Sequence, residues 1–503
     1  MDRIMYTVRI KYNKEEYNLS ADGGSLLDII RKAGIPIGAP CGGKGTCEKC
    51  KVVAYDPATE VHGAEVLACK VRVDSNLMVE VPSLPQARIL AEAYWPDMDI
   101  QWNEPRQEPD YGIAVDIGTT TVVVFLEDLN THKNIATHSF LNPQSSYGAD
   151  VITRIQAVMQ QPEALREQKQ LIVRAINDAI HRLVEENSLS GEDIRHLSIA
   201  GNTTMLHLLL GVDPSGLAVY PFAPAFLDEQ TLSGAELGLE YCTDASVRLL
   251  PSLSAFVGAD ILAGMAATEL TDDEEYSLYL DIGTNGEMAL GNSKRIITCA
   301  TAAGPAFEGA KISCGLGGVN GAIHSFDGKA FETIGSVPPS GLCGSGLVDA
   351  VAWLLNSKRL DSSGYLEEAV SLLEGEAMAD GLPLQLTPLD IREVQLAKGA
   401  IAAGIQTLLA EAEISEPQVK RIFLAGGFGY ALHVESAARI GLIPRGLKDK
   451  VIRAGNLAGL GARLALHSED FIKRVNNIRE KAEYFELSNH LGFNEAFVME
   501  MNF

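Results

Sequence analysis

One short phrase occurs twice in this chain and limits its possible folds more than any other feature. YGIAVDIGTTTVVVFLEDL spans residues 111–129, and YSLYLDIGTNGEMALGN spans residues 276–292. Each copy has the pattern of an apolar strand, a tight turn rich in glycine and threonine, and a second strand. Each is followed later by a helix, a strand and a glycine turn, in residues 193–211 and 419–434. This duplication predicts a multidomain α/β protein that contains two matching lobes.

The repeated phrase contains residue types that bind the phosphates of a nucleotide. An aspartate at the end of an apolar strand, here Asp116 or Asp281, can hold Mg²⁺ directly or through water. The turn after each aspartate exposes N–H and hydroxyl donors to phosphate oxygens. Two such hairpins facing each other would grip a triphosphate from both sides. The candidate turn residues are Gly118, Thr119, Thr120 and Thr121 in the first copy, and Gly283, Thr284, Asn285 and Gly286 in the second.

Three further segments are weaker candidates for phosphate binding. In AGNTTM, Asn202 and Thr203 either reach the phosphates or only cap the helix that follows them. Gly304 and Gly344 precede expected helices, and helix N-termini suit anions. Close helix packing or turn geometry would explain a glycine at these two positions equally well.

The N-terminal part of the chain carries a cysteine pattern, C-x5-C-x2-C-x18-C. In a reducing compartment such clustered cysteines are metal ligands rather than disulfides. Zinc ribbons pair two CxxC knuckles, and this pattern has only one, whereas plant-type [2Fe–2S] sites have three cysteines in one loop and a distant fourth. We therefore predict an iron–sulfur cluster, with zinc as the less favoured alternative. The expected ligands are Cys41, Cys47, Cys50 and Cys69.

The segments around the cysteines predict a small α+β domain of the β-grasp type over residues 1–82, with a hairpin, one helix over residues 25–34 and further strands. A proline-containing stretch without periodicity follows, and we interpret residues 83–109 as a mobile linker. The first lobe is then expected at residues 110–275 and the second at residues 276–503.

Composition excludes some classes of function. The 503 residues carry a formal net charge of −25, which argues against binding to nucleic acid. No apolar run reaches the length of a membrane span, and the start of the chain has no signal-peptide core. We therefore expect a cytoplasmic protein that does not contact a membrane.

The motifs resemble two known families. VDIGTTT is similar to the phosphate-1 motif of the ASKHA superfamily (acetate and sugar kinases, Hsp70 and actin), LDIGTNG to its phosphate-2 motif, and FLAGGFG to its adenosine motif. The resemblance implies two RNase H-like lobes that close over ATP, with Asp116 and Asp281 serving Mg²⁺ and the attacking water. It also implies that Gly426, Gly427 and Phe428 lie at the adenosine. The cysteine loop resembles those of [2Fe–2S] ferredoxin domains.

The combination of both parts resembles the reductive activators of corrinoid-dependent proteins. The resemblance extends to NPQSSYGADVITRI (142–155), SAFVGADILAG (254–264) and the closing YFELSNHLGFNEAFVMEMNF. It implies an enzyme that couples ATP hydrolysis to transfer of one electron from its cluster to the Co(II) corrinoid of a methyltransferase system, which regenerates Co(I). The implied partners are a corrinoid protein and a low-potential electron donor. Larger members have a middle domain, which we expect to be missing here.

Other functions remain open at this point. An electron-donating activator of another low-potential metalloenzyme would also need both parts, whereas a metabolite kinase of the ASKHA superfamily would leave the cysteine loop unexplained. A redox-sensing regulator without turnover is a third alternative. The sequence does not assign the docking surface, for which residues 256–260 are only a candidate, or the oligomeric state, for which a homodimer is one option.

Overall fold

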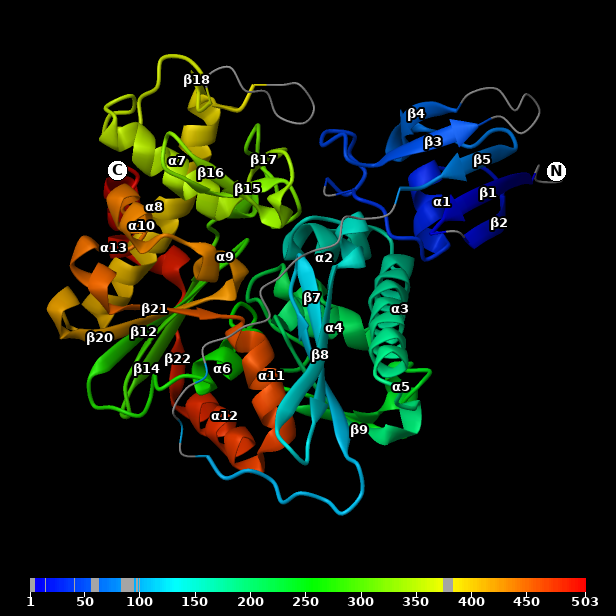
Figure 1. Ribbon diagram of the computed structural model, residues 1–503, viewed down its shortest axis with the longest axis horizontal. Coiled ribbons are helices and arrows are strands. Elements are labelled where there is room, and N and C mark those ends of the chain that lie inside the picture. The colour runs from blue at the N-terminus through cyan, green and yellow to red at the C-terminus, as the bar shows by residue number, and fades with distance from the viewer. Residues whose placement is uncertain are drawn as a thin grey trace. The chain divides into compact units, whose positions relative to one another are not determined.

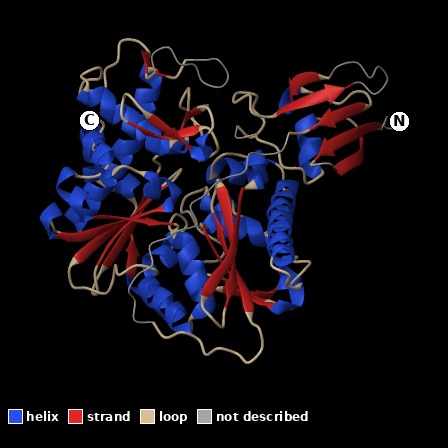
Figure 2. Ribbon diagram, viewed as in Figure 1, coloured by secondary structure: helices blue, strands red, loops and turns tan. Residues whose placement is uncertain are grey.

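The computed structural model describes residues 5–13, 15–39, 41–55, 63–82, 95, 98, 100–373 and 383–503. The chain forms two compact units, one of residues 1–86 and 106–249, the other of residues 87–105 and 250–503 (Figure 1). Both units combine strands with helices, and each contains a six-stranded sheet (Figure 2). None of the helices in the described ranges is long and apolar enough to cross a membrane.

The N-terminal domain is the predicted β-grasp fold. Its five-stranded sheet has the order β2-β1-β5-β3-β4, with β1 and β2 antiparallel and β1 and β5 parallel. Helix α1 packs against this sheet through Leu26, Leu27 and Ile30, which share one core with Ile10 and Val79. The bounds are β1 Tyr6–Tyr12, β2 Glu15–Ala21, α1 Leu26–Lys32, β3 Lys51–Tyr55, β4 Ala64–Leu67 and β5 Leu77–Glu80.

The predicted linker lies partly outside the described residues, which omit 83–94, 96, 97 and 99. Its stretch 100–105 is held on the second unit. The Asn103 amide N–H donates to the carbonyl oxygen of His467 at 2.8 Å, and the Ser468 hydroxyl donates to the carbonyl oxygen of Gln101 at 2.6 Å. This stretch is therefore fixed between helices α11 (Leu457–His467) and α12 (Glu469–Lys481), and the expectation of a mobile tether is wrong for it.

The six-stranded sheet of the first unit has the order β10-β11-β9-β6-β7-β8. Strands β6, β7 and β8 form an antiparallel meander, and β9 and β11 continue the sheet in parallel with β6. The bounds are β6 Tyr111–Ile117, β7 Thr121–Asp128, β8 Lys133–Leu141, β9 Ile194–Gly201, β10 Gln230–Ser233, β11 Ser246–Leu249, α2 Val151–Gln160, α3 Glu163–Glu186, α4 Thr203–Leu210 and α5 Gly234–Leu237.

The sheet of the second unit repeats this arrangement. Its order is β21-β20-β12-β13-β14-β22, so that the antiparallel meander β12-β13-β14 matches β6-β7-β8, and the parallel strands β20 and β21 match β9 and β11. The duplication predicted from the sequence is therefore present in the strand order. The bounds are β12 Tyr276–Ile282, β13 Gly286–Gly291, β14 Ile296–Thr301, β20 Val419–Ala425, β21 Val451–Gly455 and β22 Ala482–Tyr484.

Helices and small sheets complete the second unit. Buried side chains of α7 and α8 share one core with those of β12, β13 and β14. The bounds are α6 Ala259–Ala266, β15 Ala322–Phe326, β16 Phe331–Thr333, β17 Gly341–Leu342, α7 Gly344–Asn356, β18 Val370–Ser371, β19 Gln385–Leu386, α8 Pro388–Glu411, α9 Gly426–Ala431, α10 Val434–Ile440 and α13 Leu491–Met499.

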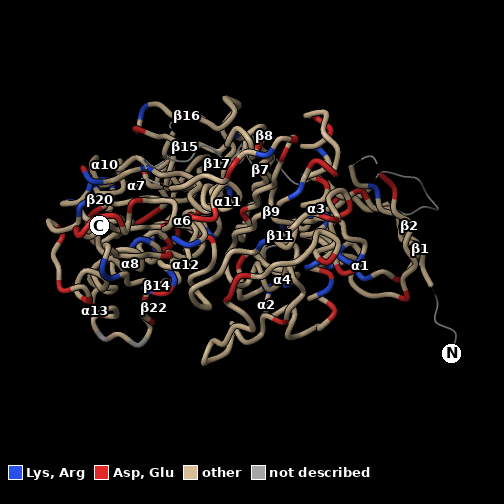
Figure 3. Tube along the Cα trace, turned by 90° about the horizontal axis from the view of Figure 1, so that it is seen from below, with Lys and Arg blue, Asp and Glu red and all other residues tan. Residues whose placement is uncertain are grey.

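Acidic and basic residues both occur throughout the described chain. Asp and Glu number 66 against 41 Lys and Arg, and Figure 3 shows the two signs interspersed along the tube.

Candidate functional site

Three of the predicted cluster ligands lie in one glycine-rich loop, and the fourth, Cys69, lies in the 3-10 turn Ala68–Lys70 that follows β4. Cys41, Cys47 and Cys69 are partly exposed and Cys50 is buried, and all four thiols are free. The Cys47 thiol donates to the sulfur of Cys41 at 3.2 Å. The loop uses left-handed backbone conformations at its three glycines, with φ values of +67° at Gly42, +94° at Gly43 and +75° at Gly45. Glycine adopts such values without strain, which lets the loop turn closely on itself.

The loop favours a thiolate at one position in particular. Burial alone would raise the pKa of Cys41, but hydrogen bonds from the Cys47 thiol and from the backbone N–H groups of Thr46, Cys47 and Gly43 lower this pKa to about 6. Burial and the neighbouring thiol of Cys50 raise the pKa of Cys69 to about 11. Four thiols that crowd one another beside convergent N–H donors suit an iron–sulfur cluster, which binds thiolates and accepts hydrogen bonds at sulfur.

The first repeated turn connects β6 to β7. Asp116 is half-buried near the end of β6, and the Gly118 N–H donates to the carbonyl oxygen of Thr121 at 2.9 Å. A Cβ atom on Gly118 would lie 2.7 Å from that same oxygen, so this position requires glycine. The turn therefore has the compact form that the sequence predicts between Asp116 and Thr121.

Two residues that the sequence analysis did not select hold this turn in place. Asn142, fully buried, donates from Nδ2 to the carbonyl oxygen of Gly118 at 2.8 Å, and its backbone N–H donates to that of Thr120 at 2.8 Å. Arg154, also fully buried, donates to the carbonyl oxygen of Thr119 at 2.5 Å. Both lie in NPQSSYGADVITRI, which had contributed to the resemblance without a role for any residue.

Asn202 does two things at once. Its Oδ1 accepts from the backbone N–H of Met205 at 3.0 Å, so it is the N-cap of α4, and its Nδ2 donates to Oγ1 of Thr119 at 3.0 Å. Thr203 is the first residue of α4 and is buried. The capping alternative is therefore correct for Asn202, and direct contact of Asn202 or Thr203 with phosphate remains a prediction.

The second repeated turn connects β12 to β13 in the same manner. Gly283 N–H donates to the carbonyl oxygen of Asn285 at 2.8 Å, and β13 begins at Gly286. The Thr284 hydroxyl donates to Oε2 of Glu308 at 2.6 Å. Glu308 was not predicted from the sequence, although it lies only four residues after the candidate Gly304.

Carboxylates gather around this second turn. Burial, together with the neighbouring carboxylates of Asp260 and Glu308, raises the pKa of Asp281 to about 7. Burial and the carboxylates of Asp260 and Asp281 also raise the pKa of Glu287 well above its ordinary value. No group of three or more His, Cys, Asp or Glu side chains in the described ranges is arranged to hold a metal ion, which applies to the four cysteines as well as to these carboxylates, so both the cluster ligands and Mg²⁺ remain predictions. The repulsion among these carboxylates would be relieved by a cation.

The predicted adenosine motif lies beside the second turn. Gly426 begins α9 with φ +80°, and a Cβ atom there would lie 2.9 Å from Oδ1 of Asp281. A Cβ atom on Gly427 would meet no heavy atom within 4 Å, so this glycine borders open space. Phe428 stacks on Phe307 with ring centroids 5.0 Å apart.

The two remaining glycine candidates differ from each other. Gly344 begins α7, and a Cβ atom there would lie 2.0 Å from the carbonyl oxygen of Phe307, so close packing explains this glycine. Gly304 has φ +78°, and its Cβ position is open. Cys343, which precedes α7, is buried as well.

A cavity of about 640 Å³ in the second unit contains none of the predicted residues. It lies where α7, the start of α10 and the end of β15 meet. On its wall, Nδ1 of His433 lies 2.7 Å from Oδ2 of the buried Asp349. Because Asp349 and His433 are far apart in the sequence, no local pattern could have found this pair.

Three family models match the chain. One described as "C-terminal domain of RACo the ASKHA domain" matches residues 275–503, one described as "RACo middle region" matches residues 111–273, and a "2Fe-2S iron-sulfur cluster binding domain" matches residues 10–74. The ferredoxin-like and ASKHA assignments are confirmed. Residues 111–273, which match the model of the RACo middle region, are the residues that we expected to form the first lobe, and the lack of a further domain before them stays a prediction.

Similar proteins are named for the activation or reduction of corrinoid proteins. The corrinoid activation enzyme RamQ of Eubacterium limosum is 28% identical over 97% of this chain and 98% of its own length. The [Co(II) methylated amine-specific corrinoid protein] reductase of Methanosarcina barkeri is 26% identical over 78% of this chain and 77% of its own. A solved structure titled "Reductive activator for corrinoid,iron-sulfur protein" is 30% identical, covers 99% of this chain and 98% of its own, and superposes with a TM-score of 0.72. The chain therefore belongs to the family of reductive activators of corrinoid proteins.

Proposed function

We propose that this protein passes one electron from a [2Fe–2S] cluster to the Co(II) corrinoid of a partner protein and so restores Co(I), with ATP bound and hydrolysed in the course of the reaction. The observation that carries the proposal is the presence, in one chain, of the cysteine loop with its distant fourth cysteine and of two matching turns suited to phosphates. The names of the relatives supply the class of acceptor. The electron count is balanced, because one cluster is oxidised by one electron for each cobalt reduced.

The involvement of ATP has a thermodynamic reason. For a one-electron step, each 59 mV by which the acceptor couple lies below the donor costs a factor of ten in the equilibrium constant. Two lobes that close over ATP can favour one arrangement of the partners over another, provided that ATP binds the two arrangements with different affinity. In this proposal, ATP makes an otherwise unfavourable reduction effective.

The roles of the residues at the cluster follow from the loop. A [2Fe–2S] cluster exchanges one electron at a time. Cys41, Cys47, Cys50 and Cys69 would supply its thiolates, and the N–H groups of Gly43 and Thr46 would favour the anionic sulfur of Cys41, as they already do in the free loop. A low-potential donor protein is the proposed source of the electron.

The roles of the residues at the nucleotide follow from the two turns. The N–H and hydroxyl groups of residues 118–121 and 283–286 would donate to phosphate oxygens. Asp116 and Asp281 would orient Mg²⁺ and the attacking water, with Asp281 ionising once a cation offsets the neighbouring carboxylates. Gly426, Gly427 and Phe428 would lie at the adenosine, Gly304 would border the nucleotide, and Gly344 is a packing position.

The test is an anaerobic visible spectrum of the protein with reductant, a Co(II) corrinoid protein and ATP. A Co(I) band that requires both ATP and the four intact cysteines is the expected result. Reduction of the cluster without any change at cobalt, for every corrinoid protein tried, would favour an activator of another metalloenzyme. ATPase activity that rises only with the corrinoid protein separates this function from that of a metabolite kinase.

The proposal keeps several expectations from the sequence. It places the activator in the cytoplasm and divides the chain into residues 1–82, 83–109, 110–275 and 276–503. A homodimer is the oligomeric state to test first, by light scattering of the purified protein with and without nucleotide.

A further inference from the structure

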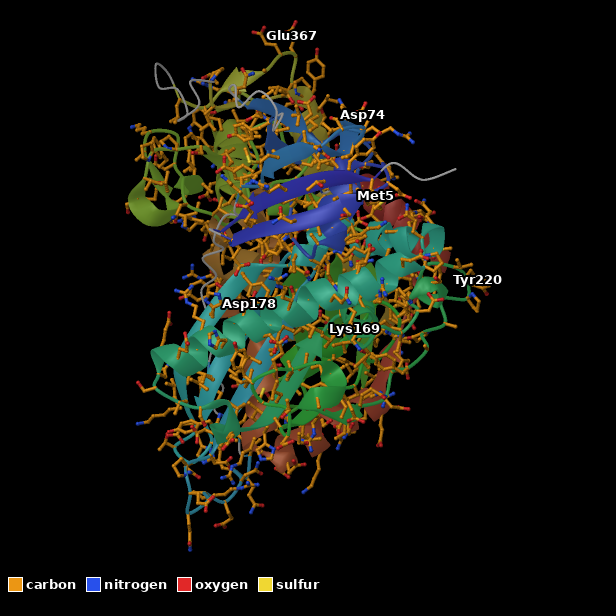
Figure 4. The ribbon with its side chains drawn as sticks, turned by 90° about the vertical axis from the view of Figure 1, so that its right-hand side faces the viewer. Met5, Asp74, Lys169, Asp178, Tyr220 and Glu367 are labelled. Carbon is orange, nitrogen blue, oxygen red and sulfur yellow. The ribbon has the colours of Figure 1, made fainter. Side chains whose placement is uncertain are left out.

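The iron–sulfur domain and the first lobe make a reciprocal contact within the first unit. Arg31 of α1 lies over the ring of Tyr147, with its guanidinium carbon 4.6 Å from the ring centroid. In the opposite direction, Arg174 of α3 lies over the ring of Tyr17 at 5.9 Å and donates to the Tyr17 hydroxyl at 3.1 Å. Lys169 and Asp178 mark the course of α3 in Figure 4. Each side thus supplies one arginine and one tyrosine, and such cation–π pairs stabilise a contact when they exclude water.

The contact at Arg31 is buried and reaches the cluster loop. Arg31 is 8% exposed and Tyr147 is 4% exposed, and Arg31 also donates to the backbone carbonyl oxygen of Ser146. Gly42, which follows the ligand Cys41, would place a Cβ atom 3.2 Å from the carbonyl oxygen of Tyr147. The loop that carries the cysteines therefore packs directly on residues 146 and 147.

The same stretch of chain holds the first phosphate turn. Asn142 donates to the carbonyl oxygens of Gly118 and Thr120, and Arg154 donates both to that of Thr119 and, from Nε at 3.0 Å, to that of Gly148. Residues 142–154 thus bond three consecutive carbonyls of the turn, and their middle part receives Arg31. A short continuous set of contacts joins the cluster loop to the turn.

We propose that residues 142–154 couple the docking of the iron–sulfur domain to the binding of phosphate at residues 118–121. This inference rests on the proposed function, in that the turn binds a nucleotide. When the iron–sulfur domain docks, the contacts of Arg31 fix the positions of residues 146 and 147. This keeps Asn142 hydrogen-bonded to the turn, and the turn is then preorganised to bind phosphate. Because such coupling is reciprocal, bound nucleotide strengthens the docking of the iron–sulfur domain by the same factor.

Arg31→Gln tests the coupling, and Lys32→Gln is the matched control, because Lys32 is the exposed neighbour on the same helix and loses the same charge. Affinity for a fluorescent, non-hydrolysable ATP analogue with Mg²⁺ is measured on the full chain with its cluster intact. We expect Arg31→Gln to weaken binding about five-fold, at the lower end of typical allosteric coupling, and Lys32→Gln to match the wild type.

Hydrogen exchange supplies the reciprocal measurement. The analogue should slow exchange in residues 26–50 of the wild type and of Lys32→Gln, and not in Arg31→Gln. If Arg31→Gln loses its cluster on purification, Arg174→Gln removes the contact from the other side and should weaken binding in the same direction, because Arg174 is a half-exposed residue of α3.

The outcomes separate this inference from the proposed function. Equal affinity in the wild type and in the folded arginine variants, with exchange in residues 26–50 unaffected by the analogue, would overturn the coupling and leave nucleotide binding intact. Failure of the wild type to bind the analogue at all would overturn both.

Discussion

Gly426 lies directly against Asp281, so that a Cβ atom on the glycine would lie 2.9 Å from the carboxylate oxygen Oδ1. The two residues come from different parts of the second unit, the start of α9 and the strand β12. The glycine turn expected at the adenosine and the aspartate expected at the phosphates therefore share one corner. A side chain at position 426 would enter this corner, whereas one at position 427 would meet no heavy atom within 4 Å.

Gly426→Ala should destabilise the second unit by about 1 to 3 kcal/mol, because alanine is strained at φ +80° and its methyl group would crowd Asp281. Gly427→Ala is the control, and its unfolding midpoint in urea should stay within error of the wild type. Both variants should bind nucleotide more weakly if the backbone approaches adenosine here. A Gly426→Ala protein as stable as the wild type would contradict the geometry.

Asp281 should make stability depend on pH in a defined direction. Its pKa rises from 3.8 to about 7 in the fold, so the folded protein binds more protons than the unfolded chain between these values, and stability falls as pH rises through this window. The full effect is at most about 4 kcal/mol. Urea unfolding in EDTA at pH 5 and pH 8 should show that Asp281→Asn gains stability relative to the wild type at both pH values, and clearly more at pH 8 than at pH 5.

Asp273→Asn serves as the control for this experiment, because the fold shifts the pKa of Asp273 in the opposite direction from that of Asp281. Lys420 holds the pKa of Asp273 below its ordinary value, so its contribution is present above that value and is lost as pH falls. Since this ion pair is at the surface, its removal should cost no more than about 1 kcal/mol at pH 8. A gain in stability for both variants would show that net charge, rather than the local carboxylates, decides the result.

Replacement of any one of the four clustered cysteines by serine should abolish the visible absorption of a [2Fe–2S] cluster. Cys343→Ser should retain this absorption, since the Cys343 thiol is buried and contacts the carbonyl oxygen of Ile323 at 3.3 Å. Iron and sulfide analysis of protein purified without oxygen checks both statements. Stoichiometric zinc without iron in the wild type would show that the loop binds the other metal.

Asn202 offers a way to separate stability from nucleotide binding. Asn202→Ala removes the cap of α4 and should cost about 1 kcal/mol, whereas Asn202→Ser should recover most of this cost because serine is a good N-cap. Serine is too short to reach Thr119, so both variants should bind nucleotide more weakly than the wild type. Recovery of nucleotide affinity in Asn202→Ser would mean that the contact with Thr119 is unimportant.

The sequence was sufficient for features that follow from local pattern. Alternating apolar residues and glycine turns predicted the β-grasp domain, and the doubled phrase predicted the doubled sheet. It was insufficient where a residue's partner is a backbone carbonyl far along the chain. Asn142 and Arg154 are of this kind, because nothing near them in the sequence indicates the carbonyls of Gly118 and Thr119.

Two glycines also show that the local sequence does not reveal tertiary contacts. Gly344 and Gly304 precede helices in the same way, and the sequence could not distinguish an anion site from close packing. The distinction depends on tertiary contacts: the carbonyl oxygen of Phe307 approaches Gly344, whereas a Cβ atom on Gly304 would meet no heavy atom within 4 Å. The prediction of a mobile linker was wrong at residues 100–105 for a related reason. The composition of the linker indicates mobility, but Asn103 hydrogen-bonds to the end of α11, which is far along the chain.

The strand β22 affects how readily this protein would aggregate. It adds to the edge strand β14 by parallel pairing at residues 296–298, whereas the matching edge strand β8 of the first sheet begins with exposed residues that include Lys133. Open strand edges invite pairing between molecules, and proteins counter this with charge or by covering the edge. The two copies of the fold thus resist aggregation by different means. Mild damage that detaches residues 482–484 should therefore make the protein precipitate before it unfolds.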